Sequence, residues 1–263
     1  MNKHPKPLKR FGQNYLVDQN IVKKIISQFD PTNKDLILEI GPGRGVLTKH
    51  LNNTGGKVYA VEIDKRVIDD LTEKFENVEF ISKDFLKINL GDYSDGRKFR
   101  IIGNIPYNIT SSILFKLIGD IDFVQDALFM VQYEVAARII SKPRTKEYGI
   151  LSVILNQFFQ VELCFKVPPT VFYPKPKVNS AIISLKPNEI IDSFDKKLFI
   201  NVVKGAFGNR RKSLKNSYSN SIFGTYKLTS FPVDLTKRAE ELEISDFLKI
   251  YNYFKSKVDE QPN

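Results

Sequence analysis

Cysteine and histidine are scarce in this chain. The one cysteine, Cys164, excludes an internal disulfide, and the two histidines, His4 and His50, are far apart with no cysteine cluster near them. Protein zinc sites are built from several cysteine and histidine ligands. We therefore expect no metal centre, which also argues against the zinc-dependent deaminases that act on nucleic-acid bases.

Long apolar segments are also missing. No run reaches the roughly 18 residues that a membrane-spanning helix needs, and residues 1–10 are basic but lack the apolar stretch of a secretory signal. With 42% hydrophobic residues among 263, the chain has enough apolar material to bury a sizeable core. We expect a soluble, cytoplasmic globular protein with no membrane contact, and we take a monomer as the default.

Positive charge is in excess and is concentrated in two segments. The 40 Lys and Arg residues outnumber the 30 Asp and Glu residues, for a net charge of +10, and residues 1–17 and 204–217 contain basic residues but no acid. Such segments suit an anionic partner such as a nucleic acid, although a run of charge is also commonly just a solvated face. The candidate contacts are Lys9, Arg10, Arg210, Arg211 and Lys212.

Helical and strand-like apolar patterns alternate along residues 18–131. Strands are expected at residues 36–40, 57–62, 78–81, 100–103 and 127–131, and helices are expected to start near residues 18, 46, 65 and 110. This alternation is typical of a doubly wound α/β sheet. Two more apolar runs, at residues 161–167 and 180–185, flank a proline-rich loop and indicate a closing antiparallel pair.

The pattern becomes helical beyond Pro187. Helices are expected at residues 196–207, 211–220 and 245–257, with no strand among them. We therefore place a domain boundary near residues 186–194. It separates a larger domain of residues 1–190 from a small all-helical domain of residues 191–263.

A glycine-rich turn follows the first strand of the predicted sheet. Gly41, Gly43 and Gly45 allow backbone to approach a ligand closely, and the helix after the turn offers free N–H groups. Glu62 ends the next strand 19 residues after Gly43, where an acid can accept hydrogen bonds from ribose hydroxyls. A tight turn also needs glycine for structural reasons alone. The prediction of a cofactor site therefore depends on the presence of Glu62 as well as the turn.

Two features separate an adenosyl cofactor from a dinucleotide. The turn contains Pro42 and departs from the usual dinucleotide fingerprint. Asp84, just after the third strand, can bond an adenine amine while its neighbour Phe85 covers the ring. An S-adenosylmethionine site therefore fits better than a nicotinamide site, although Asp84 is equally placed to cap a helix.

The segment from Asn104 to Tyr107 places an amide, a rigid backbone corner and an aromatic ring at a strand end. Pro106 fixes its own φ and keeps Ile105 extended, so the Ile105 carbonyl and the Asn104 side chain are able to point the same way. This arrangement suits a site that holds the amino group of a planar base. The alternative is an ordinary strand-to-helix loop.

Taken in order, these motifs resemble the small-subunit ribosomal RNA adenine N6,N6-dimethyltransferase family, the kasugamycin-sensitivity type. The resemblance covers almost the whole chain, from residues 11–16 through the glycine turn and residues 104–110, 132–138, 148–149, 172–180 and 206–212 to residues 238–242. It implies a Rossmann-type class I methyltransferase sheet, S-adenosylmethionine as cofactor, and ribosomal RNA or a pre-30S-type particle as partner. The matches beyond residue 190 favour this family over the related large-subunit RNA methyltransferases.

The resemblance also implies roles for individual residues. The expected cofactor contacts are Asn14, Leu16, Gly41, Gly43, Glu62, Ile63, Asp84, Phe85 and Asn104. The expected catalytic residues are Asn104, Ile105, Pro106 and Tyr107, with Phe172 as the second face of the base pocket. The number and adjacency of the methylated adenines, two methyl groups on each of two neighbours, come from the resemblance alone.

Two other hypotheses remain open from the sequence. The chain could act mainly as a ribosome-assembly factor that occupies RNA, with methylation secondary. It could also methylate a small molecule, in which case no affinity for RNA is expected. The basic segments argue against the second hypothesis, and the intact glycine turn and Asn104 corner argue that catalysis is retained.

Overall fold

The computed structural model describes residues 13–189 and 194–259. The described chain divides into two compact units. The first contains residues 13–136 and 161–187, and the second contains residues 137–160 together with the described part of residues 188–259. The expected contacts Lys9 and Arg10 lie outside the described residues.

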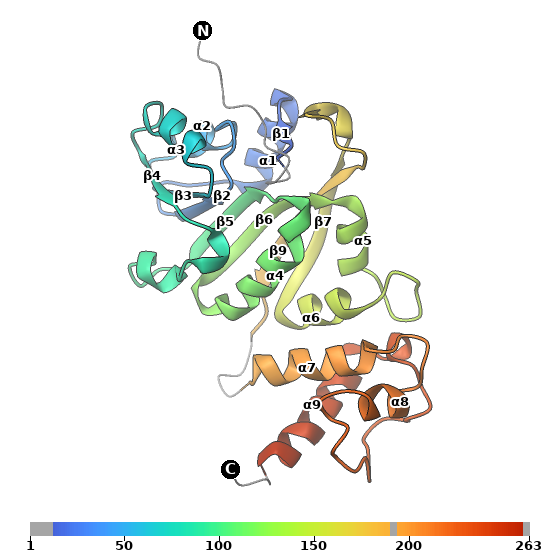
Figure 1. Cartoon of the computed structure of the whole chain (residues 1–263). Coiled ribbons are helices and arrows are strands. Elements are labelled where there is room, and N and C mark those ends of the chain that lie inside the picture. The colour runs from blue at the N-terminus through green and yellow to red at the C-terminus, as the bar shows by residue number, and fades with distance from the viewer. Residues whose placement is uncertain (1–12, 190–193, 260–263) are drawn as a thin grey trace. The chain divides into compact units, whose positions relative to one another are not determined.

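A seven-stranded sheet forms the centre of the first unit (Figure 1), with strand order β4-β3-β2-β5-β6-β9-β7. Its strands are β2 (Leu36–Ile40), β3 (Lys57–Glu62), β4 (Val78–Ser82), β5 (Phe99–Asn104), β6 (Val124–Gln132), β7 (Phe159–Val167) and β9 (Ser180–Pro187). Strands β2 to β6 pair in parallel, and β9 pairs antiparallel with β6. The expected α/β sheet is confirmed, and β9 and β7 are neighbours in it as the two apolar runs predict.

Helices alternate with the parallel strands, and the first four of them are the ones that the sequence pattern predicts. They are α1 (Gln19–Phe29), α2 (Thr48–Leu51), α3 (Lys65–Thr72), α4 (Thr110–Gly119) and α5 (Tyr133–Ile139). Helix α1 begins where the Asp18 carboxylate accepts hydrogen bonds from the backbone of Asn20 and Ile21, and it ends at Asp30 in the left-handed conformation. Helix α2 begins at Thr48, two residues after the expected start near residue 46, and has four residues. All five residues of β2 are buried, as expected for a parallel strand covered on both faces.

The direction of strand addition reverses between β2 and β5. From β2 the chain adds β3 and β4 on one side, and then adds β5 and β6 on the other. In open α/β sheets, ligands bind at such a switch point, outside the carboxyl ends of the strands. The sequence motifs at residues 41–45 and 104–107 both lie directly after these two strands.

A second, two-stranded sheet joins distant parts of the first unit. Strand β1 (Tyr15–Leu16) pairs antiparallel with β8 (Phe172–Tyr173), so that Leu16 faces Phe172 and Tyr15 faces Tyr173. Both strands have two residues, and a pair of residues carries no periodicity that the sequence pattern could reveal.

The second unit is helical. It contains α6 (Ile150–Phe158), α7 (Lys196–Phe207), α8 (Leu214–Ser219) and α9 (Ile244–Asp259). Aromatic rings fill its core: Phe158 meets Phe199 edge to face at 5.9 Å between centroids, and Phe207 stacks on Phe247 at 5.9 Å. Helix α8 begins three residues later than expected, after a turn closed by the Lys212 N–H on the Asn209 carbonyl.

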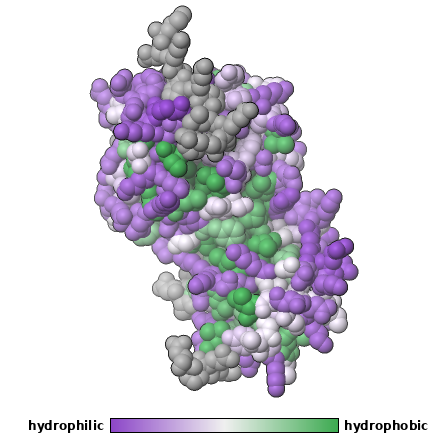
Figure 2. All heavy atoms as spheres, viewed as in Figure 1, coloured by the Kyte–Doolittle hydropathy of each residue, from purple (hydrophilic) through white to green (hydrophobic). Residues whose placement is uncertain are grey.

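Residues 137–160 pack with the C-terminal helices, although they precede the boundary placed near residue 190. A boundary inferred from composition divides the chain at one point. Helix α6 lies before that point in the sequence, yet it packs against α7 and α9. Hydrophilic residues cover most of the visible face of the first unit, and hydrophobic residues show through toward its centre (Figure 2). Across the described ranges, no helix is long and apolar enough to cross a membrane.

Candidate active site

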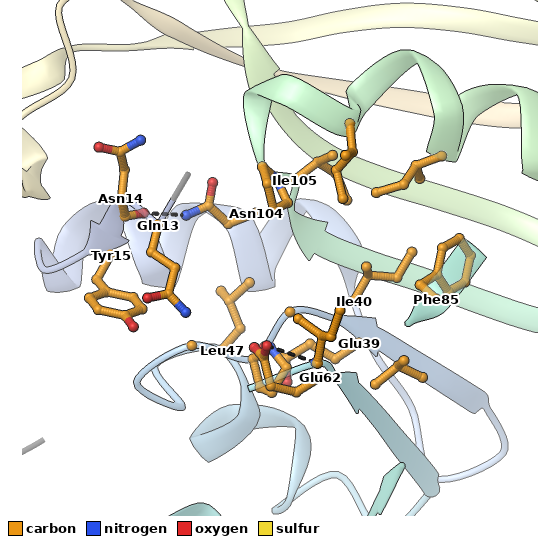
Figure 3. Close-up of a pocket in the computed structure, with 18 of the residues that line it drawn as sticks. Gln13, Asn14, Tyr15, Glu39, Ile40, Leu47, Glu62, Phe85, Asn104 and Ile105 are labelled. Atoms are coloured by element: carbon orange, nitrogen blue, oxygen red, sulfur yellow. Dashed lines mark hydrogen bonds between the residues drawn. The ribbon is translucent and has the colours of Figure 1, made fainter. Parts of the chain in front are cut away.

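A cavity of about 280 Å³ opens at the carboxyl ends of β2, β3 and β5. Twelve of the residues predicted from the sequence line it: Asn14, Leu16, Gly41, Gly43, Glu62, Ile63, Asp84, Phe85, Asn104, Ile105, Pro106 and Tyr107. Figure 3 shows Glu39 and Glu62 on the side of the cavity opposite Asn104 and Ile105. The structure thus brings the glycine turn, Glu62 and the Asn104 corner around one space.

The glycine turn presents bare backbone to this cavity. Gly43 has a φ of +56°, and a Cβ atom there would lie 3.0 Å from Cδ1 of the Tyr15 ring. A side chain at this position would be strained and would also press on Tyr15. The Gly41 N–H donates to the Val61 carbonyl at 2.9 Å, which ties the turn to β3.

Backbone donors orient the Glu62 carboxylate at the end of β3. Its Oε1 atom accepts hydrogen bonds from the N–H groups of Ile63 and Asp64, both at 2.9 Å. Burial raises the pKa of Glu62, and these backbone bonds oppose the rise by stabilising the charged form. A fixed, buried carboxylate of this kind fits the hydroxyls of a ribose.

Glu39 is a second buried carboxyl in the cavity, and the sequence reasoning gave it no role beyond the glycine motif. Its Oε2 atom accepts a hydrogen bond of 2.6 Å from the Thr48 hydroxyl. Removal from water raises the pKa of Glu39 to about 7, with the nearby Glu62 charge adding to the rise and the Thr48 bond opposing it. Its place at the end of β2 before the glycine turn was the signal that could have identified it.

Asp84 shows the helix-capping geometry that the sequence left open. Its Oδ1 atom accepts a hydrogen bond of 3.0 Å from the Leu86 N–H, at the start of the 3₁₀ turn η2 (Phe85–Lys87). The residue also lines the cavity together with Phe85. Capping fixes the carboxylate and does not exclude a contact of its other oxygen with an adenine amine.

The structure adds Tyr15 and Arg44 to the cavity wall. Within the described part of the chain, the Tyr15 hydroxyl and Arg44 Nε are buried without a hydrogen-bond partner. The Arg44 guanidinium lies 4.8 Å from the centroid of the Tyr15 ring and 5.4 Å from that of Tyr173. Because unpaired buried polar groups are costly, these atoms fit a site in which a polar ligand supplies the partners, as S-adenosylmethionine does. No sequence pattern connects the two residues.

The Asn104 side chain is held in one orientation. Its Nδ2 atom donates to the Asn14 carbonyl at 2.8 Å (Figure 3), which leaves Oδ1 as the oxygen available to accept from a ligand. The next residue, Ile105, is buried, and its N–H donates to the Met130 carbonyl of β6 at 3.0 Å. Both groups of the predicted corner are thus fixed by backbone partners.

Tyr107 is also anchored, whereas Phe172 is not at the cavity. The Tyr107 hydroxyl bonds to the Ser180 hydroxyl at 2.7 Å, and burial raises the Tyr107 pKa. The Phe172 ring is 4% exposed and packs in the core cluster with Leu16 and Val22. The residues that line the cavity beside Tyr107 do not include Phe172, although Leu16, which packs in the same cluster, is among them.

The three basic residues near the end of α7 differ in their surroundings. Arg210 is engaged within the second unit: its Nε donates to a Glu240 carboxylate oxygen at 3.0 Å, and its Nη2 donates to the Lys146 and Tyr148 carbonyls. All three residues are exposed, but among the described residues the structure shows side-chain partners only for Arg210. Within the described ranges, no three His, Cys, Asp or Glu side chains form a group that could hold a metal ion.

Comparisons with known proteins identify the family of the chain. The family model "Ribosomal RNA adenine dimethylase" matches residues 6–256. The chain is 43% identical to "Ribosomal RNA small subunit methyltransferase A" of Francisella tularensis subsp. novicida, over 94% of this chain and 97% of the relative.

Two solved structures have the same fold. A dimethyladenosine transferase from Plasmodium falciparum superposes with a TM-score of 0.78 and 27% identity, over 92% of this chain and 98% of the other. The 23S rRNA methyltransferase ErmE gives a TM-score of 0.67 and 25% identity, over 92% and 100%. The sheet with its class I methyltransferase topology, the motifs around one cavity and the match along nearly the whole chain lead to one conclusion: the chain belongs to the ribosomal RNA adenine dimethylase family.

Proposed function

We propose that this chain transfers methyl groups from S-adenosylmethionine to N6 of two adjacent adenines near the 3′ end of small-subunit ribosomal RNA, giving N6,N6-dimethyladenosine. The observation that carries the proposal is the fixed amide of Asn104, whose Oδ1 is left free of the Asn14 bond at the edge of the cavity. The 43% identity to a small-subunit methyltransferase over 94% of the chain supports the choice of RNA.

The cofactor lies between the glycine turn and the Asn104 corner in this proposal. Glu62 binds the ribose hydroxyls, Asp84 and Phe85 bind the adenine, and Gly41 and Gly43 provide backbone at close range. The remaining contacts are Asn14, Leu16, Ile63 and Asn104. S-adenosylmethionine supplies an electrophilic methyl group on a sulfonium.

The corner directs the nucleophile. The adenine amine is a poor nucleophile because its lone pair is delocalised into the ring. When Asn104 Oδ1 and the Ile105 carbonyl each accept one N6 hydrogen, the nitrogen becomes pyramidal and its lone pair points at the methyl group. The N6–C bond forms as the C–S bond breaks, and the amine proton leaves to water. Acceleration comes from positioning and from acceptors that strengthen as N6 becomes positive.

The base leaves its stack to reach this corner. Tyr107 packs on one face of the adenine, held there by its hydroxyl bond to Ser180, and Phe172 is the proposed second face. Stacking of a base on an aromatic ring contributes about 1 to 3 kcal/mol. A monomethylated amine keeps one hydrogen, so one acceptor contact survives for the second transfer. Pro106 fixes the backbone between the Ile105 carbonyl and the Tyr107 ring.

RNA backbone is bound elsewhere, by basic residues at Lys9, Arg10 and the end of α7. We propose that the chain acts as a cytoplasmic monomer on ribosomal RNA in a pre-30S-type particle. The experiment is mass spectrometry of small-subunit RNA from cells with and without this gene. Loss of dimethyladenosine on deletion, restored by the intact gene, is the expected result. Unchanged dimethyladenosine would overturn the proposal, and a loss confined to large-subunit RNA would move the target to that subunit.

A further inference from the structure

The loop between α5 and α6 carries three cations on the second unit. Lys142, Arg144 and Lys146, which we call the loop cations, are exposed, and the structure shows no side-chain hydrogen bond or ion pair for them among the described residues. Residues 141–148 contain a single acid, Glu147. Within residues 141–148 the one aromatic, Tyr148, is 2% exposed, and the exposed hydrophobic side chain of the loop is Ile140, at its start, which is 40% exposed.

This loop is held in a definite conformation. The Tyr148 hydroxyl donates to the Leu242 carbonyl at 2.9 Å, and the Arg144 N–H donates to the Glu240 carbonyl at 2.8 Å. Arg144 has a φ of +67°, a conformation that a non-glycine residue keeps only where its surroundings impose it. The loop cations are therefore displayed by an ordered segment.

Arg210 provides the connection to the end of α7. Its guanidinium donates to the carbonyls of Lys146 and Tyr148 on the loop, and to the Glu240 side chain. These three contacts, made by Nε and Nη2, hold the planar fork in one orientation within the unit. Arg211 and Lys212 follow on the same turn, exposed and without a side-chain partner among the described residues. Arg210 thus holds the loop cations next to them.

We propose that the loop cations, Arg211 and Lys212 form one surface that binds the phosphate backbone of RNA, and that Arg210 is a positioning residue that holds the loop beside them. The inference rests on the proposed function and deepens it by naming further RNA contacts. A phosphodiester chain fits this surface because it presents regularly spaced negative charge. A protein partner fits less well, because protein interfaces are centred on apolar and aromatic anchors and are poor in lysine.

Two matched triple variants test the surface. Lys142→Gln, Arg144→Gln and Lys146→Gln together remove the loop cations. Lys34→Gln, Arg97→Gln and Lys98→Gln remove two lysines and one arginine that are exposed on the first unit, just before β2 and β5. The two variants therefore have the same net charge, and a general loss of positive charge affects both equally.

Filter binding of purified small-subunit ribosomal RNA between about 50 and 200 mM salt gives the slope of log affinity against log salt. Loss of three phosphate contacts makes the slope of the loop variant shallower by about 2 to 3, at about 0.7 to 0.9 per contact, while the control keeps the wild-type slope. Equal slopes for the two variants would overturn the inference. Methylation of the same RNA by the wild-type protein is measured in parallel. Absence of methylation would contradict the proposed function, whereas equal salt slopes contradict only the RNA-binding surface.

The role of Arg210 is tested at constant charge. Arg210→Lys keeps the positive charge but loses the planar fork, so we expect faster amide hydrogen exchange in residues 142–147 and weaker RNA binding. Arg211→Lys, the matched control, leaves both unchanged because a phosphate contact needs only the charge. Wild-type exchange and wild-type affinity in Arg210→Lys would contradict the positioning role.

Discussion

Replacement of Glu39 by glutamine is expected to change how the stability of the protein depends on pH. The side chain is 1% exposed, and glutamine keeps an oxygen for the Thr48 hydroxyl, which donates to Glu39 Oε2 at 2.6 Å. Burial raises the pKa of Glu39 from 4.5 to about 7, so ionisation opposes folding. Glutamine removes that ionisation with little change in shape.

The sign follows from proton binding in the two states. Below pH 4.5 the Glu39 carboxyl is protonated in both the folded and the unfolded state, so it does not lower the stability of the protein. As the pH rises toward 7, the unfolded chain releases the proton while the folded chain holds it, so stability falls, and above 7 the full cost is present. The folded and unfolded pKa values differ by about 2.5, and at about 1.4 kcal/mol per unit this gives a cost of about 3 to 4 kcal/mol.

Urea unfolding of the wild type and of Glu39→Gln at pH 5 and pH 8 provides the assay. The free energy of unfolding of Glu39→Gln relative to the wild type should be about 2 to 3 kcal/mol larger at pH 8 than at pH 5. Glu79→Gln, at an exposed position on β4, is the control and should show the same difference from the wild type at both values. A difference for Glu39→Gln that stays constant between pH 5 and pH 8 would refute the reasoning.

Two further predictions concern the walls of the site. Gly103→Ala places a Cβ atom 2.6 Å from the Ile40 carbonyl oxygen, whereas a Cβ atom at Gly119 in α4 meets nothing within 4 Å. Urea unfolding should show a loss of about 1 to 3 kcal/mol for Gly103→Ala and none for Gly119→Ala, and equal stabilities would contradict the close approach of β5 to β2. Tyr107→Phe leaves the fully buried Ser180 hydroxyl without its partner, at a cost of about 1 to 3 kcal/mol. Adding Ser180→Ala should recover part of that cost, and additive losses in the double variant would show that the hydroxyls do not interact.

Regular parts of the fold could be predicted because their pattern is local. Residues 57–62 form β3 as expected, since a buried parallel strand is a short apolar run. Helix α6 was missed because Ile150–Phe158 is apolar on most of its faces and shows no clear helical period. Strands β1 and β8 were missed because two-residue strands are defined by their partner and not by their own sequence.

The candidate site was predictable where residues follow strand ends. Glu62 ends β3 and Asn104 ends β5, the two parallel strands on either side of β2, so topology alone brings them to the same edge of the sheet. The contact of Arg44 with Tyr15 and Tyr173 could not be predicted, because it depends on tertiary packing between distant segments. Phe172 illustrates the same point, since its motif predicts a base contact and its packing places the ring in the core.

Methyl transfer by Asn104→Ala tests the central claim most directly. The measurement is the rate of dimethyladenosine formation in small-subunit RNA by purified protein, with RNA and S-adenosylmethionine binding measured on the same samples. Loss of one preorganised acceptor costs about 3 to 4 kcal/mol in the transition state, so the rate should fall by roughly two to three orders of magnitude while RNA binding persists and S-adenosylmethionine still binds. A near-normal rate in Asn104→Ala would contradict the assignment of this corner as the group that directs the adenine amine.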